Sequence, residues 1–156
     1  NKWIKESKPT TMSKSLNFKS SFNFKIDKTW LSSKNQILKN IKNPEYLILD
    51  ARNTNRFNGT EIEPRKGLRS GRIPFSKNIF WKNLTINSGE YLKKKLIRKE
   101  FSKYNLKNKN IIFSCGSGIS ACILSLSMKE VLDIKGSVYD GSWAEWGLNK
   151  KLPIEK

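Results

Sequence analysis

Short apolar runs separated by stretches of helical pattern dominate the chain from about residue 32 onward. Three runs are bounded by polar or turn-forming residues and predict buried strands, at residues 46–50, 110–114 and 136–139. The stretches between and after them predict helices at about residues 33–41, 90–104, 121–132 and 143–147. Strands that alternate with helices in this way predict an α/β fold, in which a parallel sheet is covered by helices on both faces.

Two parts of this pattern bear on function. Residues 53–80 contain several Gly and Pro residues and predict a long irregular connection, which in a compact domain is usually functional. The predicted helix at residues 121–132 is apolar around nearly its whole circumference, so we expect it to be buried. Cys122 lies within that helix and is interpreted as a core residue.

The first 31 residues are polar, with isolated large apolar side chains, and are interpreted as a strap on the surface of the domain. Apolar and polar residues alternate over residues 22–26, which predicts a short strand. Pro9 breaks any helix that begins near Trp3. The same short pattern, a Trp followed by a polar stretch and a Pro, occurs at Trp3 to Pro9 and at Trp146 to Pro153. Such a repeated pattern is what two tandem copies of one domain would show.

Composition narrows the classes of function. The 156 residues suffice for one domain, and no apolar run is long enough to cross a membrane. The chain has two Cys and no His, so it cannot by itself build a Ser-His, Cys-His or His-metal site. Its net charge of +18 comes from 31 basic and 13 acidic residues. Most of the basic residues are Lys and are scattered along the chain, which is typical of solvent-exposed positions that tolerate many residues rather than of a specific nucleic-acid site. Nonspecific attraction to phosphates would need only the charge.

Cys115 follows a predicted buried strand and opens a Gly-rich loop that leads into a helix. Loop N–H groups and the helix N-terminus can then surround its sulfur, which favours the thiolate and hence a nucleophile. The alternative is a buried, inert Cys. A phosphatase-like loop needs an Arg six residues after the Cys to hold phosphate, and Ala121 occupies that position, which disfavours phosphoryl chemistry.

Three arginines follow the first predicted strand: Arg52, Arg56 and Arg65. The carboxyl ends of neighbouring parallel strands share one crevice, so we expect these residues near Cys115. The forked guanidinium matches a carboxylate, which predicts a small anionic ligand. The alternative for each is a surface charge or an internal pair with Asp50, Glu61 or Glu63.

Several motifs, in this order and spacing, carry a family resemblance: residues 50–52, 56–65, 71–74, 115–121 and 139–146. They resemble the C-terminal catalytic domain of two-domain sulfurtransferases of the rhodanese family, and the uncharged loop resembles the 3-mercaptopyruvate branch. The resemblance implies a rhodanese-like domain at residues 32–156, preceded by an interdomain linker strap at residues 12–31. Residues 1–11 would be the tail of an N-terminal rhodanese domain missing from this chain. Arg72 departs from the His that the family usually has before Ile-Pro.

The resemblance also implies residue roles. Cys115 would be the nucleophile that forms a persulfide, and Ser117 would assist proton transfer with a His and an Asp of the first domain. Arg56 and Arg65 would hold the substrate carboxylate and carbonyl. The loop that surrounds the sulfur would consist of Gly116, Ser117, Gly118, Ile119 and Ser120.

The expected function is sulfur transfer from 3-mercaptopyruvate to cyanide or a thiol acceptor such as thioredoxin, in the cytoplasm. No metal, cofactor, membrane or specific nucleic-acid partner is expected. One alternative is a thiosulfate sulfurtransferase, against which the uncharged Gly116 and Ser117 argue because thiosulfate is a dianion. Another is a catalytically silent binding module, against which Cys115 and the two arginines argue.

Overall fold

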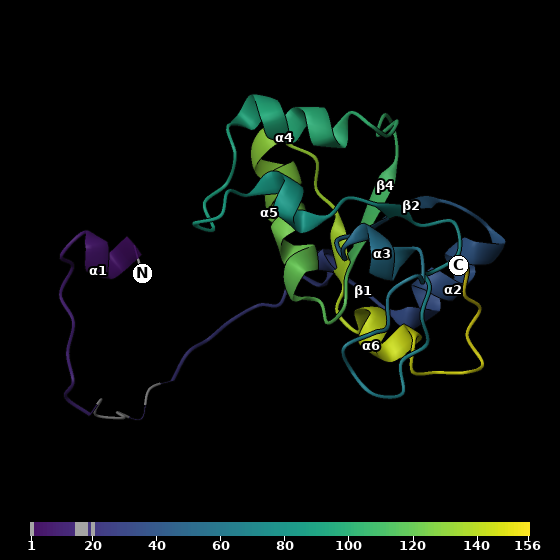
Figure 1. The fold of residues 1–156 in the computed structure, drawn as a ribbon, viewed down its shortest axis with the longest axis horizontal. Helices are drawn as coiled ribbons and strands as arrows, with labels where there is room; N and C mark the ends of the chain where they lie inside the picture. The colour runs from purple at the N-terminus through teal and green to yellow at the C-terminus, as the bar shows by residue number, and fades with distance from the viewer. Residues whose placement is uncertain (1, 15–18, 20) are drawn as a thin grey trace.

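A computed structural model describes residues 2–14, 19 and 21–156 and contains a parallel sheet of five strands (Figure 1). The strand order across the sheet is β1 (Leu31–Ser32), β5 (Ser137–Tyr139), β4 (Asn110–Ser114), β2 (Tyr46–Asp50) and β3 (Lys77–Asn78). The three buried strands expected from the apolar runs are confirmed. The two edge strands have only two residues each, too few to show a pattern in the sequence.

Helices cover both faces of the sheet, so the predicted fold class is confirmed. One face packs against α4 (Lys94–Phe101), α5 (Ile119–Leu132) and the 3-10 helix η2 (Trp81–Leu84), and the other against α2 (Lys34–Lys42) and α6 (Ser142–Trp146). Alternation along β4 sends Ile111 and Phe113 to the first face and Ile112 to the second. None of the helices in the described part of the chain has the length and apolar character needed to span a membrane.

The helix expected at residues 90–104 is shorter than predicted, because α4 begins only at Lys94. The preceding residues form a turn instead, in which Gly89 adopts a φ of 88° and Thr85 pairs with Tyr91. By contrast α2 begins where its cap predicts. Ser33 accepts a hydrogen bond from the Gln36 N–H, and the Gln36 side chain accepts one from the Ser33 N–H.

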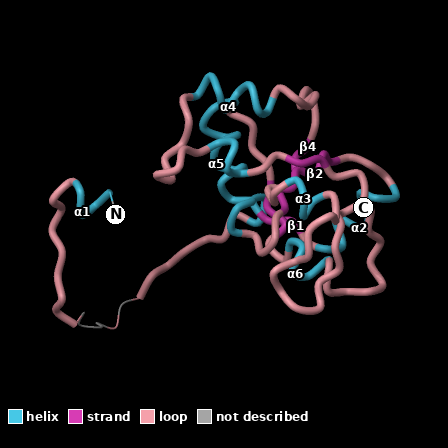
Figure 2. Tube along the Cα trace, in the orientation of Figure 1, coloured by secondary structure: helices cyan, strands magenta, loops and turns pink. Residues whose placement is uncertain are grey.

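Helix α1 (Lys2–Lys5) stands at the start of the N-terminal segment, outside the packed domain (Figure 2), and its Lys2 ammonium pairs with the Glu90 carboxylate of the domain. The strand predicted at residues 22–26 is wrong: the segment is extended, but it pairs with no strand in the described chain, and its apolar side chains are exposed. The segment meets the domain again at Asp27, which caps η1 (Lys28–Trp30), and at Thr29 within η1; both contact the Lys135 ammonium. Part of the expected strap, residues 15–18 and 20, lies outside the described residues.

Candidate active site

The candidate site lies where β2 and β4 end side by side, with Asp50 opposite Ser114 in the register. The connection after β2 packs on the α6 face through Ile73, whereas the loop after β4 leads into α5 on the other face. The two segments diverge and leave a crevice between them. A pocket of about 370 Å³ occupies it, lined by Arg56, Glu63, Pro64, Arg65, Leu68, Trp81, Cys115, Gly116, Ser117, Ile119, Ser120 and Ile123.

This pocket brings together all the residues to which the family resemblance gave a role in the site, except Gly118. Gly118 instead shapes the loop from behind. Its φ is 85°, and a Cβ there would lie 2.9 Å from the Asp140 carbonyl oxygen, so glycine is required on both counts. The chain therefore turns sharply from β4 into α5, and the helix N-terminus faces the loop.

The Cys115 loop, residues 115–120, directs a backbone donor at the sulfur. The Ser117 N–H donates to Cys115 Sγ at 3.4 Å. The same peptide group is held from its other end, because the Ala144 N–H donates to the Gly116 carbonyl at 2.9 Å. The N–H and C=O of a trans peptide point in opposite directions, so this bond to α6 keeps the Ser117 N–H directed at the sulfur. Such donors stabilise negative charge on a nucleophile.

A buried ion network stands beside the loop. The Glu63 carboxylate is fully buried and bridges two arginines, accepting from Arg52 Nη1 at 2.8 Å and from Arg56 Nη2 at 2.6 Å. Arg52 also pairs with Asp50 and lies over the Trp143 ring, 4.4 Å from its centroid. The internal pairing considered as an alternative is thus confirmed for Arg52 and Arg56. Arg52 does not line the pocket.

The two arginines expected to hold substrate differ in how many of their guanidinium N–H groups already have a hydrogen-bond partner. Arg56 lies in the short helix α3 (Thr54–Phe57), and Glu63 occupies its Nε and Nη2. Its guanidinium lies against the loop, since a Cβ on Gly116 would be 3.0 Å from Arg56 Nη2. Arg65 is exposed at the pocket, and no described residue hydrogen-bonds to its side chain. Arg65 is therefore the guanidinium with its full fork open to an anion.

The prediction that Cys122 is a core residue is wrong. Cys122 is exposed on α5, on the same outward face as Ile119 and Leu126, whose exposed fractions are 76% and 52%. Its thiol donates to the Gly118 carbonyl at 3.4 Å. Partial burial, with smaller contributions from Cys115 and Asp140, raises the pKa of the Cys122 thiol. Cys122 therefore stays protonated more readily than an ordinary Cys, which argues against it as the nucleophile.

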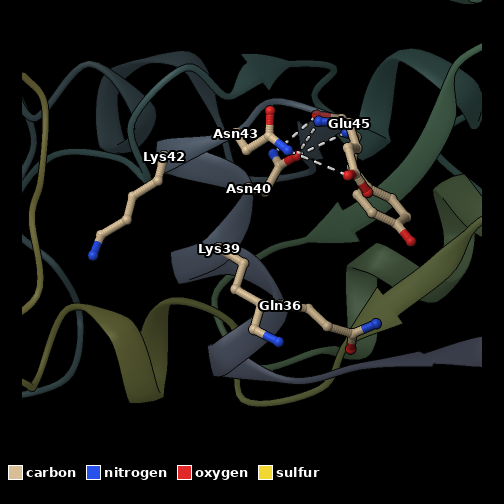
Figure 3. Close-up of a pocket in the computed structure, with 7 residues that line it drawn as sticks. Gln36, Lys39, Asn40, Lys42, Asn43 and Glu45 are labelled. Carbon is tan, nitrogen blue, oxygen red and sulfur yellow. Dashed lines mark hydrogen bonds between the residues drawn. The ribbon is translucent and has the colours of Figure 1, made fainter.

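A second, larger hollow of about 470 Å³ lies at the C-terminal end of α2 (Figure 3). The Asn40 side chain there accepts from the N–H groups of Glu45 and Tyr46 and donates to the Tyr46 carbonyl. These bonds form the turn into β2, at the amino ends of the strands, whereas Cys115 lies at their carboxyl ends. The polar groups of Asn40 are used within the turn, and the residues that line this hollow include no Cys and no Arg, so it has neither the nucleophile nor the guanidinium groups of the Cys115 pocket.

Some pocket residues were not predicted from the sequence. Leu68, Trp81 and Ile123 form the apolar wall, but single apolar residues in a loop, a 3-10 helix and an apolar helix carry no separate signal. Glu63 was considered only as a possible partner of an arginine. Its position between two arginines in the residue 56–65 motif was the signal that could have identified it.

Comparisons with known proteins agree with this geometry. The rhodanese-like domain family matches residues 33–149. The Arabidopsis thaliana protein "thiosulfate/3-mercaptopyruvate sulfurtransferase 1, mitochondrial" is 40% identical over 77% of this chain and 32% of its own length. The Escherichia coli 3-mercaptopyruvate sulfurtransferase is 40% identical over 69% of this chain and 38% of its own length.

Among solved structures, SseA from Escherichia coli, described as a 3-mercaptopyruvate sulfotransferase, superposes with a TM-score of 0.73 at 26% identity. The match covers 90% of this chain and 52% of SseA. The chain thus spans about a third to a half of the length of these proteins, as one domain of a two-domain protein would. The family match, the parallel sheet and the loop around Cys115 lead to one conclusion: the chain belongs to the rhodanese family.

Proposed function

We propose that this chain is the catalytic domain of a sulfurtransferase that carries sulfur as a persulfide on Cys115, with 3-mercaptopyruvate as the donor. The observation that carries the proposal is the Ser117 N–H donating to Cys115 Sγ at the floor of a pocket that Arg56 and Arg65 also line. A stabilised sulfur beside two guanidinium groups suits a small sulfur donor that bears a carboxylate.

In the proposed reaction the Cys115 thiolate attacks the sulfur of 3-mercaptopyruvate. The new S–S bond forms as the C–S bond breaks, and the electron pair passes to carbon as the enolate of pyruvate. Arg65 and the free edge of Arg56 would stabilise the negative charge of this enolate, which then takes a proton to become pyruvate. A thiol acceptor such as thioredoxin, or cyanide, would then attack the outer sulfur and release Cys115.

Ser117 is proposed to assist the proton transfer. Its N–H is already committed to the sulfur, and none of the described residues hydrogen-bonds to its hydroxyl. The hydroxyl is therefore free to meet a substrate group or a residue of another domain. In this proposal the partners of the hydroxyl come from the first rhodanese domain.

The choice of donor depends on Arg65 and the uncharged loop. Thiosulfate is the second candidate, because the Arabidopsis relative is named for both donors. The test compares kcat/KM for the two donors in the wild-type chain, in Arg65→Lys and in Lys66→Ala, a neighbouring exposed cation. We expect Arg65→Lys to lower kcat/KM for 3-mercaptopyruvate about 10- to 100-fold, because an ammonium cannot make the forked contact, and to affect thiosulfate less.

The outcomes of this test separate the candidates. Lys66→Ala should leave the donor ratio unchanged, which would show that losing a neighbouring positive charge does not by itself change the choice of donor. A folded Arg65→Lys variant with wild-type use of 3-mercaptopyruvate would remove the substrate assignment. A wild-type chain that prefers thiosulfate would favour the second candidate, and transfer from neither donor would favour the silent binding module.

A first rhodanese domain is proposed as the neighbour of this one. The Trp3 indole N–H donates to the Pro9 carbonyl at 2.9 Å, and the Trp146 indole N–H donates to the Pro153 carbonyl at 2.8 Å. The two Trp–Pro patterns therefore share the same hydrogen bond as well as the same sequence order, which supports the proposal that residues 1–11 are the tail of an equivalent domain. The exposed apolar face of α5, beside the pocket, is the surface that such a domain would cover.

A further inference from the structure

Ser142 has an unusual backbone at the first residue of α6. It is fully buried, and its φ is 46°, in the left-handed region that residues other than glycine seldom adopt. Its neighbour Gly141 has an ordinary φ of −58°. Space favours glycine at 141, since a Cβ there would lie 2.9 Å from the Cβ of Glu145. The chain therefore places serine at the one position of this pair where glycine would fit the backbone better.

The hydroxyl of Ser142 joins the ends of two strands. Its Oγ accepts a hydrogen bond from the Cys115 N–H at 3.1 Å, at the end of β4. It donates to the Tyr139 carbonyl at 2.8 Å, at the end of β5. A serine hydroxyl has one proton to donate, and here it is given to Tyr139. With Oγ 4.0 Å from Cys115 Sγ, the hydroxyl acts on the backbone around the nucleophile.

The left-handed turn at Ser142 also aims the next two N–H groups. The Trp143 N–H donates to the Cys115 carbonyl at 2.9 Å, and the Ala144 N–H donates to the Gly116 carbonyl at 2.9 Å. Together with the hydroxyl, these bonds hold the N–H and the C=O of Cys115 and the C=O of Gly116. Three consecutive peptide planes, the last of which carries the Ser117 N–H, are therefore held by one short segment.

We propose that Ser142 is a positioning residue for sulfur transfer: its hydroxyl fixes the backbone of Cys115 so that the Ser117 N–H is directed at the sulfur. This inference rests on the proposed function, because it assigns Ser142 a part in keeping Cys115 reactive. A left-handed serine costs stability that glycine would avoid, and the buried Cys115 N–H would lack this partner if the hydroxyl were absent.

The test measures the reactivity of Cys115 without any sulfur donor. In a Cys122→Ser background, which leaves one thiol, the rate of alkylation by iodoacetamide is followed against pH. Ser142→Ala removes the hydroxyl and keeps the backbone penalty, whereas Ser142→Gly removes both. The matched control is Ser76→Ala, because Ser76 is also buried and donates to the carbonyl three residues before it, Ile73, away from Cys115.

Both Ser142 variants should shift the alkylation profile to higher pH and slow alkylation at neutral pH about tenfold, since the Ser117 N–H is no longer held toward the sulfur. Ser142→Gly should unfold at a higher temperature than Ser142→Ala, and it keeps the test available if the Ala variant does not fold. Ser76→Ala should lose stability and keep the wild-type pH profile.

A wild-type pH profile in folded Ser142→Gly would overturn the inference. If Ser142→Ala were shifted at the same time, the effect would belong to the backbone rather than to the hydroxyl. Failure of the proposed function is distinguishable, because it would appear as a wild-type chain that is alkylated normally at Cys115 but takes no sulfur from either donor.

Discussion

Replacing Glu63 by Gln is expected to destabilise the domain and disorder Arg56. Glu63 accepts hydrogen bonds from Arg52 Nη1, Arg56 Nε and Arg56 Nη2, and its side chain is fully buried. With Asp50, it balances the charges of the two arginines. Gln keeps the volume, but it leaves the cluster with a net positive charge and turns an NH₂ group toward a guanidinium that can only donate.

The magnitude follows from burial. Removing one partner of a buried ion pair costs about 3–5 kcal/mol. Arg52 keeps its contacts to Asp50 and the Gly71 carbonyl, and the Arg56 side chain is 20% exposed, so water can compensate part of the loss. We therefore expect a loss of about 2–4 kcal/mol in the free energy of unfolding. For a domain of this size that lowers Tm by roughly 5–15 °C.

The assay is urea unfolding of wild type, Glu63→Gln and Glu61→Gln, with kcat/KM for 3-mercaptopyruvate measured on the folded variants. Glu61 is the matched control because it lies on the same connection but is exposed, and among the described residues its carboxylate accepts only from Asn53. Its loss should cost less than about 1 kcal/mol. If Glu63→Gln proves as stable and as active as Glu61→Gln, the network does not hold Arg56 in place and this reasoning is refuted.

Two further predictions concern the loop and the strap. Gly116→Ala should displace the Arg56 guanidinium, because the new Cβ would lie 3.0 Å from Nη2. We expect kcat/KM to fall about 3- to 10-fold for 3-mercaptopyruvate and less for thiosulfate. Equal losses for the two donors in steady-state kinetics would contradict this prediction. Hydrogen bonds from Thr29 and Lys135 lower the pKa of Asp27 from 3.8 to about 2. Because the folded pKa lies below the unfolded one, this attachment of the strap is fully present above pH 3.8 and is lost as the pH falls through about 2. A carboxyl NMR titration should show that midpoint and move it upward in Thr29→Val, and a midpoint near 3.8 in the wild type would oppose the assignment.

The sequence predicted the fold best where a run of buried apolar residues is compatible with only one secondary structure. Both β2 and β4 have the predicted bounds, because a run of buried apolar residues that ends in a polar one marks a strand and its carboxyl end. These two ends also placed Cys115 beside the arginines. The start of α4 was mispredicted because the turn at Gly89 precedes it, and the pairing of Thr85 with Tyr91 depends on contacts that no local pattern records.

Two features of the site depended on tertiary structure. Apolar residues all around α5 suited either a buried helix or a helix with one face left for a partner, and the exposure of Cys122 supports the second. Nothing in the sequence distinguished Arg56 from Arg65 as a substrate-binding residue. In the folded connection Glu63 pairs with Arg56, whereas the Arg65 guanidinium lines the pocket without such a partner among the described residues. Ser142 had no signal of its own, because its importance lies in a backbone angle.

The central claim is that Cys115 carries the transferred sulfur. The most direct measurement is to treat the chain with 3-mercaptopyruvate, trap thiols and persulfides by alkylation, and locate added sulfur by mass spectrometry of the intact chain and its peptides. The account predicts one added sulfur atom on Cys115 in the wild type and in Cys122→Ser, and none in Cys115→Ser. Sulfur on Cys122, or a Cys115→Ser chain that still takes up sulfur, would contradict it.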